Sequence, residues 1–141
     1  MKTKKVLSLV LSVIFMMTLC IPVSAVESRA SDQIAAYMMQ VTPHSGYFSV
    51  YFSVTAAGEA DKLGCESIYV YKMVDLDWEL VRKGTKREND PGMSTKNAYD
   101  YDNSIRCNSE EGEVYKIVVT IFAENSKGRD TRAQTFYDVA Q

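Results

Sequence analysis

The stretch from Gly112 to Ala123 constrains the fold of this chain more than any other. Its middle is crowded with β-branched residues, which favour a strand over a helix. Side chains two positions apart on a strand point to the same face, and here one face is almost wholly apolar. That face consists of Tyr115, Ile117, Val119, Ile121 and Ala123. The pattern predicts a strand that faces the core.

The residues after this strand predict a hairpin. Glu124–Gly128 is polar, ends in a glycine and interrupts the apolar alternation, and Arg129–Val139 then continues as a more polar strand. A connection of about four or five residues that contains a glycine is typical of a β-hairpin.

Five further strands are expected upstream. The clearest is Tyr47–Ala56, in which apolar residues at even positions alternate with Tyr, Ser and Thr. The irregular connections are expected at Gly58–Gly64 and Gly84–Lys96, the second of which contains the turn signal Pro91-Gly92. The other strands are Ile34–Val41 (which would also suit a helix), Cys65–Val74 with Ile68 and Val70 inward, Trp78–Lys83, and Tyr99–Cys107 with Tyr99, Tyr101, Ile105 and Cys107 on one face. Seven strands at regular spacing predict an all-β fold, an antiparallel seven-stranded β-sandwich.

The first 25 residues have the features of a secretory signal peptide. Three lysines precede the apolar run Val6–Cys20, and Val23-Ser24-Ala25 offers small residues for cleavage after Ala25. About 15 apolar residues are too few to span a membrane, which takes roughly 20. Lipid attachment at Cys20 is disfavoured because the bulky Leu19 precedes it. We therefore expect a signal peptide at 1–25, a leader at 26–32 and one domain at 33–141, secreted to the extracellular space.

Removal of the signal peptide changes the charge balance. The chain after residue 25 holds 13 basic and 18 acidic residues, a formal charge of −5. Nucleic acids and anionic membranes bind basic surfaces, so neither is an expected partner. Proteins and glycans at a cell surface remain open.

Two cysteines, Cys65 and Cys107, follow the signal peptide and could form a disulfide. An even number in a secreted chain favours a disulfide. However, the strand assignment places Cys65 at one pole, pointing outward, and Cys107 at the opposite pole, pointing inward. Strands of eight to ten residues are about 25–30 Å long, whereas a disulfide needs α-carbons within about 7 Å. We therefore expect two unbonded thiols.

The alternation and its corner residues resemble fibronectin type III and immunoglobulin-like domains. Gly112-Glu113-Val114-Tyr115 is similar to the Gly-x-x-Tyr that opens the sixth fibronectin strand, where the Tyr hydroxyl ties the preceding corner. The segment Ile68–Lys72 followed by Trp78 resembles that family's third strand and the Trp after it. The resemblance gives Tyr115 and Trp78 structural roles, although the second strand lacks the family's usual Trp.

The whole chain also resembles small secreted β-sandwich proteins of unknown function from Clostridia-like Gram-positive bacteria. The similar features are the start Arg29–Ile34, Gly64 before the third strand, the single Trp, and Asp130-Thr131-Arg132 near the end. This resemblance implies a fold and an extracellular location but no activity.

No catalytic or metal motif is apparent. The only histidine, His44, lies in a turn, and neither cysteine has a setting that would activate it. Asp100–Ser104 alternates oxygen donors but lacks the glycine and the distant Glu of a calcium loop, so a solvated strand face is favoured. Gly128-Arg129-Asp130 has the wrong order for an integrin-binding Arg-Gly-Asp and reads as a turn. We expect no enzyme, no cofactor and no metal.

The nine tyrosines are the most unusual feature of the composition. Tyr supplies rigid, amphipathic contact area, but it is also common on half-buried strands. The candidate recognition surface consists of Tyr47, Tyr51, Tyr69, Tyr71 and Tyr99, with Tyr137 as a further member. The sequence thus favours a secreted, non-enzymatic binding or adhesion-type domain whose ligand is a protein or glycan. The alternative is a structural or accessory protein of an envelope, matrix or spore coat.

Overall fold

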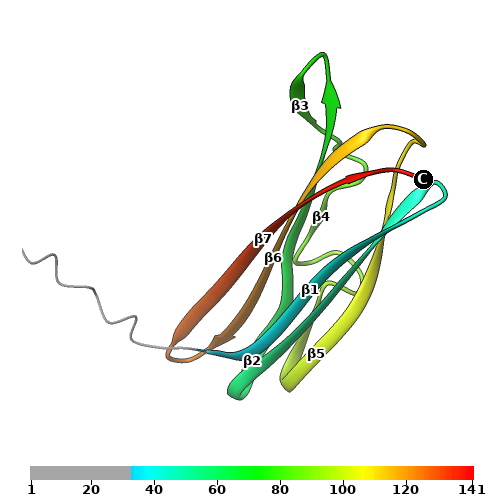
Figure 1. The fold of residues 1–141 in the computed structure, drawn as a ribbon. Coiled ribbons are helices and arrows are strands. Elements are labelled where there is room, and N and C mark those ends of the chain that lie inside the picture. The colour runs from blue at the N-terminus through cyan, green and yellow to red at the C-terminus, as the bar shows by residue number, and fades with distance from the viewer. Residues whose placement is uncertain (1–32) are drawn as a thin grey trace, which may run out of the picture. The chain divides into compact units, whose positions relative to one another are not determined.

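The computed structural model describes residues 33–141 and shows an all-β, antiparallel seven-stranded sheet without a helix among them (Figure 1). The expected signal peptide and leader therefore lie outside the described residues. The strands are β1 (Ile34–His44), β2 (Tyr47–Val74), β3 (Asp77–Leu80), β4 (Lys86–Arg87), β5 (Ser94–Asn108), β6 (Val114–Asn125) and β7 (Gly128–Val139). The helical alternative for the first segment is excluded, because β1 pairs with β2 along almost its whole length.

Strand β2 is 28 residues long and organises the sheet. Its first half, Tyr47–Thr55, pairs with β1 on one edge and β5 on the other. Its second half, Ala60–Val74, pairs with β6 on one edge and successively with the start of β5, β4 and β3 on the other. Strand β7 pairs with β6. The predicted connection at Gly58–Gly64 is therefore wrong: most of it is hydrogen-bonded strand, and the expected second and third strands are continuous.

The sheet curls so that both halves of β2 contribute to a single core (Figure 1). Residues of the first half, such as Phe48 and Phe52, are fully buried, as are Ile68 and Val70 of the second half. The predicted inner face of β6 is confirmed, since Tyr115, Ile117, Val119, Ile121 and Ala123 are all buried. The apolar residues of the alternating sequence pattern are thus the residues that face the core.

Two irregularities in β2 change the side-chain parity. Between Thr55 and Ala60 the pairing with β5 jumps, since Thr55 lies opposite Asp100 and Ala60 opposite Ala98. Tyr99 lies between these two β5 residues and is 60% exposed, so its predicted place on the face of Ile105 is wrong.

A second irregularity is a β-bulge at Glu66. Cys65 pairs with Ile121 and Ser67 with the adjacent Thr120, which leaves Glu66 as an extra residue on β2. The extra residue brings Cys65 onto the same face as Ile68, so Cys65 is fully buried rather than pointing outward as predicted.

The two thiols are both free and both buried, which confirms the absence of a disulfide. The predicted reason is wrong, because Cys65 and Cys107 lie in the same core rather than at opposite poles. Burial raises the pKa of Cys65 to about 12, and the nearby Cys107 adds a smaller increase. Burial likewise raises the pKa of Cys107 to about 11.

The remaining connections follow the turn signals in part. The expected strand Trp78–Lys83 is shorter and ends at Leu80, and the β2–β3 hairpin extends beyond the rest of the sheet (Figure 1). The irregular segment after it includes the two-residue β4 and ends at Met93, which is fully buried. This segment is fastened to β5 at Gly92, whose carbonyl oxygen accepts hydrogen bonds from the Tyr101 hydroxyl at 2.9 Å and Asn103 Nδ2 at 2.8 Å.

The corner before β6 is closed by Tyr115. Its ring is 2% exposed and packs edge-on against Phe48, with 5.3 Å between centroids. Its hydroxyl oxygen accepts a hydrogen bond of 3.0 Å from the backbone N–H of Glu110. The expected tie between this hydroxyl and the preceding turn is therefore present.

Candidate recognition surface

The five tyrosines predicted to form one recognition surface are separated in the structure. Tyr47 and Tyr51 lie on the outer face of the first half of β2, where they alternate with the buried residues. Tyr69 and Tyr71 lie on the outer face of the second half, and Tyr99 stands apart at the irregular crossing of β5. Of the five, Tyr71 is the one that lies in a cluster with other aromatic residues.

The outer face of the first half is polar. It carries Ser, Thr and Asp residues, including a contact of 3.3 Å between the hydroxyls of Ser49 and Ser104. The ring of Tyr47 is covered on two sides, since His44 stacks on it at 4.8 Å and the Arg106 guanidinium lies 3.8 Å from its centroid. Tyr51, the other ring on this face, lies between Gln40 and Ser104 rather than in an aromatic cluster.

Asp100 and Asp102, from the faint calcium motif, lie on this same polar face as exposed residues of β5. The third oxygen donor, Asn103, faces the other way and is committed to Gly92. Within residues 33–141, no group of three or more His, Cys, Asp or Glu side chains is placed to hold a metal ion.

The outer face of the second half carries an aromatic cluster formed by Tyr71, Trp78, Lys116 and Tyr137. The cross-strand register places Tyr71 opposite Lys116, and Lys116 opposite Tyr137. Lys116 Nζ lies 4.4 Å from the Tyr71 ring centroid and 5.1 Å from that of Trp78, both within cation–π range. Trp78 reaches from the β2–β3 hairpin to Tyr137, with 5.8 Å between ring centroids. The Trp78 side chain thereby connects the hairpin to β6 and β7.

The cluster is open to solvent. Tyr137 and the nearby Val139 of β7 are 65% and 49% exposed, and Leu80, opposite Tyr71, is 43% exposed. Trp78, assigned a structural role by resemblance, is half-buried and contributes to this surface as well. Lys116 was not predicted as a member of this surface, although its position between the inward Tyr115 and Ile117 indicates an outward side chain.

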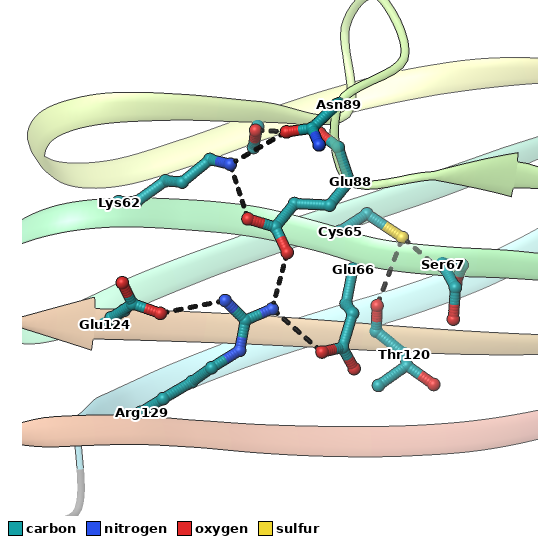
Figure 2. A network of polar contacts seen from close by, with 10 residues as sticks. Lys62, Cys65, Glu66, Ser67, Glu88, Asn89, Thr120, Glu124 and Arg129 are labelled. Atoms are coloured by element: carbon teal, nitrogen blue, oxygen red, sulfur yellow. Dashed lines mark hydrogen bonds and ion pairs between the residues drawn. The ribbon is translucent and has the colours of Figure 1, made fainter.

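A charged network occupies the other end of this outer face (Figure 2). The Arg129 guanidinium contacts Glu66 at 2.8 Å, Glu88 at 2.8 Å and Glu124 at 2.9 Å. Lys62 forms a further ion pair with Glu88. The bulge matters here, because Glu66 is the extra residue and its side chain points outward to Arg129. Arg129 belongs to the Gly-Arg-Asp sequence and is committed to this network.

The network fastens the loop after β4 to the sheet through the ion pairs of Glu88. Burial opposes the charge of Glu88, but hydrogen bonds from Arg129 and Lys62 outweigh it and lower the pKa of that carboxyl. Burial likewise opposes the charge of Arg129, but hydrogen bonds from Glu88, Glu124 and Glu66 raise its pKa. A general acid needs a raised carboxyl pKa, and Glu88 shows the opposite. The arrangement suits a fixed, polar surface.

A groove of about 510 Å³ lies between this loop and the outer face of β2 and β6. It is lined by Glu66, Ser67, Tyr69, Arg87, Glu88, Asn89 and Thr120. Tyr69 is the sequence-predicted residue in this set. The others were missed because the bulge and the folded loop bring them together, and neither is visible in the alternation.

The cysteines and the histidine take no part in this surface. Cys65 Sγ donates hydrogen bonds to the carbonyl oxygens of Ser67 at 3.4 Å and Thr120 at 3.3 Å, on the inner side of the sheet. A nucleophilic thiol needs a depressed pKa, and both thiols have raised values. The His44 ring stacks on the ring of Tyr47.

No family model matches the sequence, and neither a curated protein nor a solved structure is significantly similar to it. No part of the chain that the structure describes forms a helix long and apolar enough to cross a membrane.

Proposed function

We propose that this protein is a secreted, non-enzymatic binding domain that acts through the outer face of the second half of β2. The observation that carries the proposal is the exposed aromatic cluster, in which Trp78 and Tyr137 contact each other above Lys116. Aromatic rings with low conformational freedom contribute much of the binding energy at recognition surfaces. The ligand is a protein or glycan at a cell surface.

The contrast between the two outer faces supports this assignment. The rings of the first half are either covered, as Tyr47 is, or isolated among small polar residues. The second half instead gathers Tyr71, Trp78 and Tyr137 beside exposed Leu80 and Val139. A contiguous exposed apolar patch of this kind marks an interaction site in other soluble proteins.

Secretion and family kinship belong to the same proposal. The basic start, the apolar run and the small residues before Val26 support export from a Gram-positive cell with cleavage after Ala25. The hydroxyl tie of Tyr115 supports kinship with fibronectin type III or immunoglobulin-like β-sandwiches. Mass spectrometry of protein collected from culture medium tests the first of these: a mature start at Val26 is expected, and a lipid adduct on Cys20 would contradict it.

The binding proposal is tested with purified protein and surface substitutions. Trp78→Ser and Tyr137→Ser are expected to weaken retention on isolated cell walls and on intact cells by about tenfold, which corresponds to about 1.4 kcal/mol. The matched control is Tyr51→Ser, which removes an outer-face ring from the first half and should leave retention unchanged. Equal retention of all three variants, or no retention of the unsubstituted protein, would favour the structural alternative.

A further inference from the structure

We infer that the groove beside Tyr69 is a saccharide-binding subsite that takes a neutral, hydroxyl-rich sugar unit of a glycan. The inference rests on the proposed binding function and names its ligand class. Three properties of the groove carry it: unused hydrogen-bond donors, an aromatic wall and a balanced charge.

The groove presents polar groups whose hydrogen-bonding capacity is not used within residues 33–141. The Arg87 guanidinium forms no hydrogen bond or ion pair there, and the hydroxyls of Ser67 and Thr120 have no partner either. Asn89 uses its Oδ1 to accept from Lys62 at 3.2 Å, and its amide N–H groups remain free in this part of the chain. A sugar ring offers hydroxyl and ether oxygens that such donors bind.

The wall and the size of the groove suit one sugar unit. Tyr69 is half-buried on the outer face of β2 and borders the groove with its ring. The apolar face of a pyranose ring stacks on aromatic rings in the way other flat apolar groups do. A volume of about 510 Å³ lies within the usual range of ligand sites, roughly 300–1,000 Å³.

The charge around the groove is balanced, which distinguishes a neutral ligand from an anionic one. The groove and its network hold three cations (Lys62, Arg87 and Arg129) and three carboxylates (Glu66, Glu88 and Glu124). A polyanion would meet these carboxylates, and the chain after residue 25 is itself acidic. Hydroxyl groups can accept from the cations and donate to the carboxylates, so a neutral polyol satisfies both.

The network also preorganises the site (Figure 2). Glu88 is held between Lys62 and Arg129, and the backbone carbonyl of Glu88 accepts a hydrogen bond of 3.0 Å from the Ser94 hydroxyl. Asn89 is thereby presented toward the outer face from a fixed loop. Groups fixed before binding lose less conformational entropy when the ligand arrives. The aromatic cluster continues the same face beyond Tyr69, next to Tyr71, which gives a longer glycan further rings to contact.

Nuclear magnetic resonance titration of the ¹⁵N-labelled protein tests the inference with defined probes. Cellohexaose, chitohexaose and maltohexaose serve as neutral probes, and a hexamer of galacturonic acid serves as the anionic probe. At least one neutral probe is expected to shift backbone amide signals of residues 66–69, 87–89 and 118–120. This binding should change less than about twofold between 50 and 500 mM NaCl, because no net charge is neutralised.

Substitutions sharpen the test. Tyr69→Ala should weaken binding of that probe about tenfold, and Asn89→Ala or Arg87→Gln about threefold. Tyr69→Phe keeps the ring and should retain most of the affinity, while Tyr51→Ala on the opposite outer face is the control. Tyr69→Phe and Arg87→Gln leave the core untouched, so they remain informative if Tyr69→Ala does not fold.

Several results would overturn the inference. These are the absence of shifts with every neutral probe at about 10 mM, shifts that map only outside the groove, or salt-sensitive binding of the galacturonate hexamer alone. The proposed binding function fails separately, because it depends on retention of the Trp78 and Tyr137 variants on cell walls. If the groove assignment fails while Trp78→Ser still weakens retention, the ligand contacts the aromatic cluster without a sugar in the groove.

Discussion

The two halves of β2 have nearly the same inner face and very different outer faces. Phe48, Val50, Phe52 and Val54 of the first half are as fully buried as Leu63, Cys65, Ile68 and Val70 of the second. Outside, the first half shows a polar, hydroxyl-rich surface, and the second shows a charged network, a groove and an aromatic cluster. Formation of the hydrophobic core constrains only every second residue of each strand. The outward positions between them can therefore differ and carry function.

The difference between the halves originates in their neighbours. The first half is flanked by two long strands, β1 and β5, whose outward residues are mostly small or polar, with Met38 as an exposed exception. The second half is flanked by β6 on one edge and by the short strands β4 and β3 on the other, and the loop after β4 folds over its outer surface. The folded-over loop creates the groove, and the β3 hairpin supplies Trp78 to the aromatic cluster.

The largest effect is expected at Gly64, where the second half meets the start of β5. Its φ of 146° disfavours any side chain, and an added Cβ would lie 2.3 Å from the Met93 carbonyl oxygen. Gly64→Ala should therefore lower the free energy of unfolding by about 2–4 kcal/mol. Gly58→Ala is the matched control, because its Cβ would meet nothing within 4 Å. Chemical denaturation measures both, and equal stability of the two variants would contradict the close approach.

The inner and outer faces of β6 should contribute differently to stability. Val119 is fully buried, and Val119→Ala should cost on the order of 2 kcal/mol of unfolding free energy. Val118 is its half-buried neighbour on the outer face, and Val118→Ala should lower the free energy of unfolding by less than about 1 kcal/mol. Urea denaturation with a shared m-value measures the pair. A reversed order would mean that the face assignment of β6 is wrong.

The sequence predicted the inner face well and the outer site poorly, for a physical reason. Regular alternation identifies buried strand residues, so the burial of Phe48 and Val119 was predicted correctly. The Tyr115 corner was predicted from the resemblance of Gly112–Tyr115 to the fibronectin type III motif. A bulge interrupts that alternation by one residue, and nothing in the sequence around Glu66 marks it. Because the bulge was not predicted, the orientation of Cys65 was predicted wrongly and the outward position of Glu66 was not recognised. The groove depends on a loop that folds back on the sheet, and its residues are distant in sequence.

The Tyr115 hydroxyl gives a smaller expected effect. Tyr115→Phe leaves the N–H of Glu110 without its acceptor at a partly buried corner, which should cost about 1 kcal/mol of unfolding free energy. Tyr71→Phe is the comparison on the outer face, because the Tyr71 hydroxyl has no hydrogen-bond partner within residues 33–141. Thermal unfolding of the two variants measures the difference, and a neutral Tyr115→Phe would show that water replaces the tie.

The smallest effect is expected in the charged network. Glu88→Gln should cost about 0.5–1 kcal/mol of unfolding free energy at pH 7, since the side chain is still partly exposed. The folded pKa of Glu88 lies below its ordinary value of 4.5, so its contribution is present above pH 4.5 and is lost as the pH falls through the folded value. The stability difference between the two proteins should therefore vanish in acid. A difference that persists at pH 2 would contradict this origin.

The central position of β2 also determines how the protein opens. Strands β1, β3, β4, β5 and β6 all hydrogen-bond to β2, whereas β7 is attached through β6 alone. Strand separation requires breaking the ladders along the two paired halves of β2, so amide protons in the buried parts of these halves should exchange with solvent only on global unfolding. Those of β7 can exchange by fraying from one neighbour. The pairing of Tyr47 with Asn108 also closes a long loop, which predicts that folding is slow because such non-local contacts form late.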